Sequence, residues 1–296
     1  MNKKSFLIFT ILFCFSTICF SLQEPEEIRL LKKAYPQVKF DTFYDVQKKD
    51  WQLVMKVPFD DGSIKIHTLY WAQGRLIPQT ELPNIENYTS IFYPYNKGEE
   101  LQDPSSYTPE QIAIFKEAGN SSNRKNAPYA PDYFFDCIYD CDTRAHIEKQ
   151  LKTITFLGHK VTIHKKIVEP LGRVEKRIQE MAEYNTKVAD FVKELHQTDG
   201  YNWREIRDVN RKSFHSTGIA LDLLPEKWTK HMYWRWTKDQ KGDEWMMTPL
   251  RIRWMPPYEV INIFEDEGFI WGGRWIVWDN MHFEYRPDLI EMAKKR

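Results

Sequence analysis

The chain of 296 residues has no excess of charge of either sign. Its 42 basic and 42 acidic residues cancel, so it has no overall positive charge of the kind that attracts phosphate backbones. We therefore expect no nucleic-acid partner. Internal repeats and low-complexity segments are also absent. An aromatic content of 15% with 11 tryptophans is instead typical of a folded chain that buries one large core or two modest ones.

Cysteine is scarce as well. Two of the four cysteines, Cys14 and Cys19, lie in an apolar N-terminal segment, which leaves Cys137 and Cys141 for the rest of the chain. Two residues cannot form a disulfide scaffold. Their C-x-x-x-C spacing allows one local bridge in an oxidising compartment or two buried thiols. Of these two alternatives the bridge is slightly favoured.

Long apolar runs are absent except at the N-terminus. Lys3 and Lys4 precede an apolar run, Ser5–Phe20. Cys19 near its end and Ser21 after it are small residues suited to the positions before a cleavage point. This order predicts a secretory signal peptide over residues 1–21. The run is shorter than the roughly 20 apolar residues that span a bilayer, which disfavours an uncleaved anchor, and a lipid anchor at Cys19 fits loosely. We expect an exported protein, periplasmic or attached to the cell envelope, without a transmembrane helix in the mature chain.

Residues 22–130 form a predicted β-rich N-terminal region and linker. Apolar residues alternate with a period of two before and after the turn sequence Asp60-Asp61-Gly62, which predicts a hairpin. The alternating residues are Trp51, Leu53, Met55 and Val57, then Ile64, Ile66 and Tyr70. Residues 83–131 are rich in Pro, Asn, Ser, Tyr and Gly and predict mostly loop. One helix is expected from Thr108-Pro109-Glu110, because Thr is a good cap and Pro fits a first turn.

Residues 131–296 combine helical and strand patterns. Apolar residues at three- and four-residue intervals predict one amphipathic helix over Leu171–His196. A second helix is expected over Tyr258–Glu267, ended by Gly268. Short apolar stretches at Gly218–Leu224 and Trp278–Tyr285 predict strands. The fold class is therefore α+β. The aromatic insertion over Glu226–Pro257 either packs on the core, which we favour, or forms a wall of a cleft.

Two histidines and several carboxylates gather in two short stretches of this region. Residues 213–222 read SFHSTGIALD, and residues 279–284 read DNMHFE. A catalytic zinc site uses three protein ligands and keeps one position open, a number that His215, Asp222 and His282 would supply. Taken singly, each has a structural alternative: a buried histidine, or an aspartate that ends a strand.

Strand parity is consistent with a shared site. Asp222 shares a face with Ala220 on an otherwise apolar strand, where an unpaired carboxylate would be costly and a metal ion is a suitable partner. His282 and Glu284 likewise share a face, so Glu284 is expected to orient His282 from behind. The alternative is that Glu284 pairs with Arg286.

The pattern S-x-H-x-x-G-x-A-x-D followed by D-x-x-H-F-E resembles zinc peptidases of family M15, which include VanY-type D-alanyl-D-alanine carboxypeptidases and L-alanyl-D-glutamate endopeptidases. The resemblance covers roughly residues 134–296. Residues 201–204 (YNWR) and 268–273 (GFIWGG) also resemble segments that flank the site in that family. The resemblance to family M15 implies an antiparallel sheet with helices on one side, which is the M15 or hedgehog-like peptidase fold.

The same resemblance assigns roles. It implies one Zn²⁺ held by His215, Asp222 and His282, Asp279 as general base, and Arg204 as the arginine of the active site. Ser213 and Glu284 are expected to support the ligands, and Gly218 to let the backbone pass closely between them. Asp279 stands where the carboxypeptidase branch has Glu, and Asp is similar to the endopeptidase branch.

The function that the resemblance implies is hydrolysis of the peptide stems of bacterial peptidoglycan, either as a D-alanyl-D-alanine carboxypeptidase or as an L-alanyl-D-glutamate endopeptidase. One alternative is a non-catalytic zinc-containing cell-wall binding protein with the same fold. Another is a structural envelope protein that acts through its aromatic surface. Asp279 and Arg204 discriminate between these classes, because a binding protein needs neither.

Overall fold

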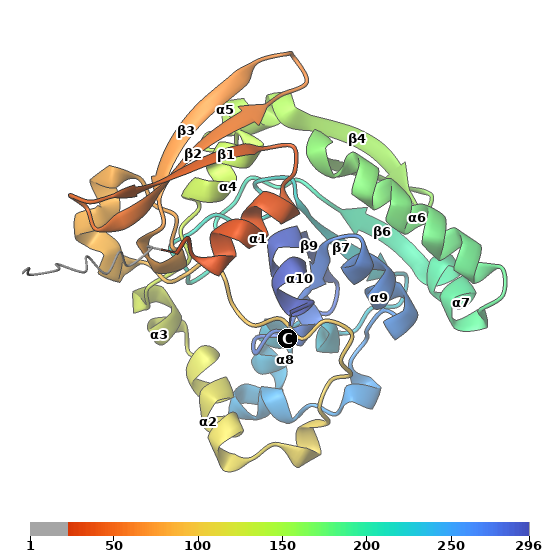
Figure 1. Ribbon diagram of the computed structural model, residues 1–296. Helices are drawn as coiled ribbons and strands as arrows, with labels where there is room; N and C mark the ends of the chain where they lie inside the picture. The colour runs from red at the N-terminus through yellow and green to blue at the C-terminus, as the bar shows by residue number, and fades with distance from the viewer. Residues whose placement is uncertain (1–22, 296) are drawn as a thin grey trace, which may run out of the picture.

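The computed structural model describes residues 23–295 and has an α+β architecture with three antiparallel sheets (Figure 1). The predicted signal peptide, residues 1–21, lies outside the described residues. Among residues 23–295, none of the helices has both the length and the apolar character needed to cross a bilayer.

The N-terminal region begins with a helix, α1 (Glu26–Ala34), and a three-stranded sheet in the order β1 (Lys39–Asp45), β2 (Asp50–Pro58) and β3 (Ile64–Tyr70). The hairpin predicted around Gly62 is confirmed as β2–β3. Leu53, Met55 and Val57 are fully buried, whereas Ile64 and Ile66 on β3 are 64% exposed. This sheet therefore packs on the protein through one face only.

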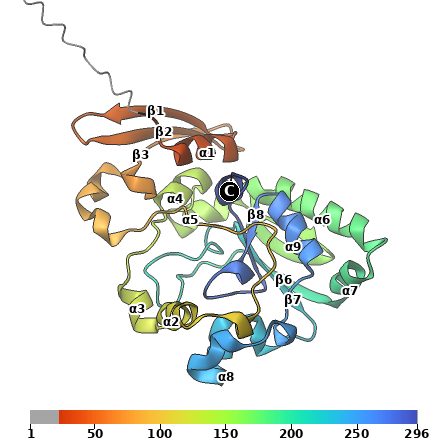
Figure 2. The same ribbon diagram turned by 60° about the horizontal axis from the view of Figure 1, so that its bottom comes forward.

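The linker was expected to be mostly loop with one helix, but it contains several short helices and little sheet. Its elements are the 3₁₀ helices η1 (Ala72–Gly74), η2 (Gln79–Asn87) and η3 (Pro104–Ser106) and the α-helices α2 (Pro109–Ala118) and α3 (Ser121–Asn126). Thr108 caps α2 in a reciprocal capping box with Gln111. The linker runs down one side of the molecule, so that α2 and α3 lie near α8 (Trp234–Lys241) and far from the β1–β3 sheet (Figures 1 and 2).

Three short helices and a hairpin connect the linker to the rest of the chain. These are α4 (Tyr133–Tyr139), α5 (Arg144–Ile147), η4 (Glu148–Gln150), β4 (Leu151–Phe156) and β5 (His159–His164). Cys137 and Cys141 fall at α4 and its end, and both are free thiols. The favoured disulfide is therefore wrong. Burial raises the pKa of the Cys137 thiol to about 12, which keeps it protonated and unreactive.

The single helix predicted over Leu171–His196 is instead two helices. After η5 (Lys165–Ile167), α6 (Val168–Ala182) ends before Asn185, and α7 (Thr186–Glu194) follows. The Asn185 side chain accepts hydrogen bonds from the backbone N–H groups of Lys187 and Val188. An asparagine in this role starts a new helix, and the apolar periodicity continued across the break and concealed it.

The central sheet has four antiparallel strands in the order β6 (Leu195–Asp199), β7 (Ala220–Pro225), β9 (His282–Tyr285) and β8 (Phe269–Trp271). The strand predicted over residues 278–285 begins only at His282 in the structure, so β9 is shorter than predicted. One face of the sheet packs on α9 (Tyr258–Asp266), where Phe264 stacks on Phe283 with ring centroids 4.0 Å apart. The other face carries Asp222, His282 and Glu284.

Helix α10 (Pro287–Ala293) departs from the expected one-sided layer. It packs on Ile270, which pairs with Glu284 and so lies on the face opposite α9. The remaining elements are the 3₁₀ helices of the insertion and of the β8–β9 connection: η6 (Lys230–Met232), η7 (Gly242–Met247), η8 (Leu250–Ile252) and η9 (Gly272–Arg274).

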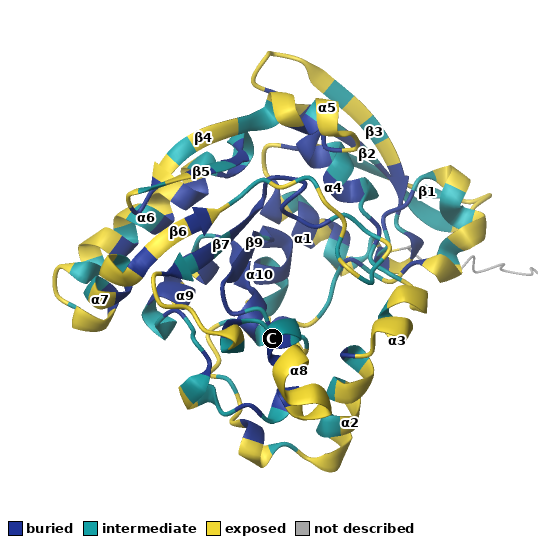
Figure 3. Ribbon diagram, turned by 180° about the vertical axis from the view of Figure 1, so that it is seen from behind, coloured by how far each residue is buried: buried dark blue, intermediate teal, exposed yellow. Residues whose placement is uncertain are grey.

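The N-terminal region shares its core with the rest of the chain. Residues of α1 and β2 belong to the same buried cluster as residues of β7 and β9, and Figure 3 shows buried segments running from α1 into the central sheet. Tyr35 donates a hydrogen bond to Asp288 at 2.8 Å. Arg286 pairs with Asp288 at 2.7 Å and donates to the Ile91 carbonyl. The domain boundary at residue 130 stays a prediction.

Candidate metal centre and active site

The three predicted metal ligands meet at neighbouring strands. Asp222 on β7 pairs in register with His282 on β9, and His215 lies in the turn that leads into β7. His282 Nδ1 is 2.8 Å from Asp222 Oδ1, and His215 Nε2 is 3.3 Å from the same oxygen and 3.2 Å from His282 Nδ1. Three potential ligand atoms therefore converge on one point.

Hydrogen bonds behind the histidines fix which nitrogen faces that point. His215 Nδ1 lies 2.6 Å from the Gly200 carbonyl, which can only accept, so Nδ1 carries the proton and Nε2 presents a lone pair. His282 Nε2 donates to Glu284 at 3.0 Å, which leaves the Nδ1 lone pair free. With neutral histidines and ionised Asp222, three acceptors face one another, an arrangement that either a proton or a metal ion between them stabilises. The residues present thus fit a divalent metal.

Electrostatics at these residues favour positive charge. Burial alone raises the pKa of Asp222, but the charges and hydrogen bonds of His215 and His282 outweigh burial and hold it well below its usual range. Burial alone lowers the pKa of His282, yet hydrogen bonds to Asp222 and Glu284 raise it well above its usual value. A bound cation would take the position that a proton otherwise fills.

Two glycines allow this packing. Gly218 has φ +68°, and a Cβ there would lie 2.9 Å from the His164 backbone nitrogen, which supports the prediction of a close backbone passage. Gly200, whose carbonyl holds His215, was not singled out from the sequence. A Cβ on Gly200 would lie 2.2 Å from the Thr162 carbonyl oxygen, so only glycine brings this carbonyl close enough to the imidazole.

Two serines hold the turn that carries His215. Ser213 Oγ accepts from the His215 backbone N–H at 3.3 Å, so it supports the turn and does not contact the imidazole ring. Ser216, which the sequence did not distinguish, is fully buried. It donates to the Arg204 carbonyl at 2.6 Å and accepts from the Arg204 N–H at 2.7 Å. Ser216 therefore attaches the Arg204 segment to the ligand turn.

Asp279, the expected general base, lies beside the ligands. Burial and then the charge of Asp222 raise its pKa to about 8, and Oδ1 is buried without a hydrogen-bond partner in the described chain. Its backbone N–H donates to the Gly272 carbonyl at 3.0 Å. The Gly272-Gly273 segment noted in the sequence thus sets where Asp279 stands. An unsatisfied carboxyl oxygen next to three metal-ligand atoms is suited to hold a water molecule.

These side chains open into a cleft of about 740 Å³. Arg204 lines it and makes no side-chain ion pair or hydrogen bond within residues 23–295. Asp208, a nearby acid in the sequence, pairs with Arg235 at 2.8 Å and not with Arg204. The positive charge of Arg204 also acts on Asp279. Arg204 is therefore free to meet an anionic group in the cleft.

Aromatic residues form much of the wall of the cleft. They come from the linker, from the insertion and from the β8–β9 connection: Tyr129, Tyr233, Trp234, Trp236 and Trp275. The expectation that the insertion packs on the core holds for Trp245, which is fully buried. Trp234 is 2% exposed and packs with Trp245 while also bordering the cleft, and for Tyr233 and Trp236 the alternative is correct, since both line the cleft.

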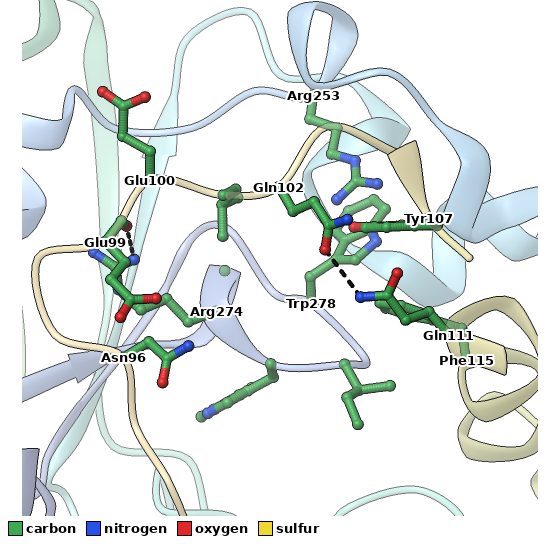
Figure 4. A pocket seen from close by; sticks show the side chains of 14 residues that line it. Asn96, Glu99, Glu100, Gln102, Tyr107, Gln111, Phe115, Arg253, Arg274 and Trp278 are labelled. Atoms are coloured by element: carbon green, nitrogen blue, oxygen red, sulfur yellow. Dashed lines mark hydrogen bonds between the residues drawn. The ribbon is translucent and has the colours of Figure 1, made fainter. Parts of the chain in front are cut away.

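A second cavity, of about 280 Å³, lies against the same connection (Figure 4). Val277 and Asp279 line the first cleft, Arg274, Ile276 and Trp278 line the second cavity, and Trp275 lines both. Gln102 from the linker accepts a hydrogen bond from Gln111 of α2 across its rim. The segment 273–279 is thus a thin partition between two cavities, and its position determines where Asp279 lies.

One other group within residues 23–295 has the composition of a metal site: Asp140, Asp142 and His146. Asp140 is paired with Lys65 at 2.6 Å, and Asp142 and His146 bond to each other at the surface. Ion pairing satisfies this group, in contrast to the three facing acceptors of the buried centre.

Comparison with known families agrees with the geometry. A family model described as D-alanyl-D-alanine carboxypeptidase, of the M15 peptidases, matches residues 207–285, and this span contains His215, Asp222, Asp279, His282 and Glu284. A domain of unknown function (DUF8518) matches residues 27–93. No curated protein and no solved structure matches the chain. The match to residues 207–285 supports an M15-family peptidase domain, and hence a hydrolase, around the centre.

Proposed function

We propose that the protein is an exported zinc peptidase that hydrolyses the peptide stems of peptidoglycan. The observation that carries the proposal is the convergence of His215 Nε2, Asp222 Oδ1 and His282 Nδ1, with an unsatisfied Asp279 carboxyl beside them. M15 peptidases are zinc-dependent. A non-catalytic zinc-binding protein would need the three ligands but neither Asp279 nor the unpaired Arg204.

In this proposal His215, Asp222 and His282 hold the zinc ion. Bound zinc supplies a Lewis acid that polarises a carbonyl and lowers the pKa of water. Asp279 takes the proton from the attacking water and returns it to the leaving amine, for which its place beside the ligands is suited. A nearby cation reduces the effect of Asp222 on Asp279 and so lowers the pKa of Asp279 toward the range that a base needs at neutral pH.

Arg204 stabilises the oxyanion or binds a carboxylate of the peptide. Its segment is held by Ser216, which also lies in the ligand turn. Glu284 and the Gly200 carbonyl keep both imidazoles oriented. Because Asp stands at position 279, we favour the endopeptidase bond over the carboxypeptidase bond.

The experiment that tests this proposal is digestion of defined muropeptides by the purified zinc-loaded protein, with and without chelator, followed by mass spectrometry. Cleavage after L-alanine indicates the endopeptidase, and free D-alanine indicates the carboxypeptidase. If no product disappears on addition of chelator, the protein is not a metal-dependent peptidase of peptidoglycan. The matched variant is Asp279→Asn, which should keep zinc but lose turnover by about 10²- to 10⁴-fold. Full activity of this variant would exclude Asp279 as the base.

A further inference from the structure

A second unpaired guanidinium lines the cleft, and it comes from the linker. Arg124 lies in α3 and lines the cleft together with Arg204. Its Nε is buried without a hydrogen-bond partner, and its side chain makes no ion pair within the described chain. The guanidinium stacks over Trp234, with its carbon 5.3 Å from the ring centroid.

The groups around Arg124 do not neutralise it. Asp208, whose charge acts on Arg124, is engaged by Arg235 at 2.8 Å and by Ser121 at 2.7 Å. Burial and then the positive charge of Arg235 lower the pKa of Arg124, against smaller opposing effects of Tyr233 and Asp208. A partly buried guanidinium without a counter-charge is costly. An anionic ligand in the cleft would offset this cost.

The charges of the whole cleft support an anionic ligand. Of its four carboxylates, Asp222 and Glu284 bond to the histidines, Asp279 lies beside them, and Asp199 accepts a hydrogen bond from Gln197. Among the other lining arginines, Arg286 pairs with Asp288 and Arg211 faces Asp132. Within the described residues Arg124 and Arg204 are therefore lining cations without an ion pair, against one such carboxylate, Asp199, and a bound metal would add further positive charge.

The position of Arg124 is fixed by contacts from both sides. Asn210 donates to the Lys125 carbonyl at 3.2 Å, and Lys238 of α8 donates to the Gly119 carbonyl at 2.8 Å. Helix α3 is thus held by the 204–212 segment on one side and, through Gly119 between α2 and α3, by α8 on the other. The linker, which the M15 match does not cover, supplies part of the cleft wall.

We propose that Arg124 is a specificity residue that binds a carboxylate of the substrate peptide, at a subsite separate from Arg204. The proposal rests on the proposed peptidase function for the identity of the ligand. Arg124 acts on binding and not on the reacting bond. It selects peptides with free carboxylates over their amidated forms, and stacking on Trp234 holds the guanidinium plane ready for a two-point contact.

The test measures binding of the stem pentapeptide L-Ala-γ-D-Glu-L-Lys-D-Ala-D-Ala by calorimetry. Three forms are compared: the free acid, the C-terminal amide and the glutamate α-amide. The protein is the full zinc-loaded chain with Asp279→Asn, and recovery of intact peptide confirms that none is cleaved. Arg124→Gln in this background should weaken binding of the free acid about tenfold and leave one amide form unaffected. Arg124→Lys should restore part of the preference.

Lys125→Gln is the matched control, because it removes one positive charge from the same helix at an exposed position outside the cleft. It should bind all three peptides as the parent does. Equal losses for acid and both amides in Arg124→Gln would overturn the proposal and leave Arg124 a packing residue. If the acid preference depends on Arg124 but the wild-type protein cleaves no muropeptide, the proposed peptidase function fails while the subsite stands.

Discussion

At the scale of single residues, backbone partners decide what each buried histidine can do. His215 donates to a carbonyl through Nδ1 and directs a lone pair toward Asp222. His164 Nδ1 accepts from the Lys166 N–H at 3.0 Å, and its Nε2 donates to the Tyr139 carbonyl at 3.0 Å. The neutral ring of His164 is therefore fully satisfied, which makes it structural. The sequence gives no sign of this difference, because the partners are backbone atoms.

His164 predicts a pH dependence of stability. Burial lowers its pKa to about 3, whereas an unfolded histidine titrates near 6.5. The unfolded state therefore binds the proton first, so the contribution is complete above about pH 6.5 and decreases as pH falls toward 3. Between pH 6.5 and 5 the loss is about 2 kcal/mol. Urea unfolding of His164→Gln should show that much less change across this interval than wild type. Equal pH dependence would show that His164 is not the source.

At the scale of elements, the β8–β9 connection determines the position of the base. A Cβ on Gly272 would lie 2.7 Å from the Asp279 carbonyl oxygen, so Gly272→Ala should displace Asp279. We expect kcat to fall about 10- to 100-fold, as small misplacements of catalytic groups do. Zinc content should stay near one per chain, because the ligands come from β7, β9 and the turn before β7.

Gly172→Ala in α6 is the control for this substitution. A Cβ at Gly172 meets nothing within 4 Å, so activity should be unchanged and stability slightly higher, since alanine suits a helix interior better than glycine. A normal kcat for Gly272→Ala would mean that the connection adapts and does not position Asp279.

Local patterns in the sequence predicted those features of the site that depend on neighbours along the chain. Parity on β7 and β9 placed Asp222, His282 and Glu284 on one face, and Thr108 and Gly268 marked helix ends correctly. Gly200 and Ser216 were missed because their roles arise from contacts between distant segments. The break at Asn185 was missed because the apolar spacing on both sides has the same period.

At the scale of the whole molecule, the N-terminal region and the site depend on one core. Asp288 is fully buried and bonds to Arg286 and to Tyr35, which caps the end of α1. Asp288→Ala would leave Arg286 buried without its partner, which should cost about 3–5 kcal/mol of stability, measured by chemical denaturation. Asp243→Ala, at a side chain that is 79% exposed, should have little effect. A loss no larger than that of the control would show that the two regions are not coupled through this pair.

This integration could not be predicted from the sequence. The β-rich region and the metal-ligand motif are separated by more than a hundred residues. Neither sequence pattern predicts that α1 packs on α10 or that α3 borders the cleft. Composition and periodicity predicted an α+β fold and a β-rich start. They did not show that the linker supplies Arg124 to the cleft wall.

The most direct test of the account is the metal content of the purified protein at equilibrium with zinc. We predict one zinc ion per chain for wild type and for Asp279→Asn. His215→Ala should lose that ion, because the two remaining ligands cannot replace the three ligand atoms that converge in wild type. Wild-type protein without bound zinc, or His215→Ala that keeps one ion per chain, would contradict the assignment of the centre.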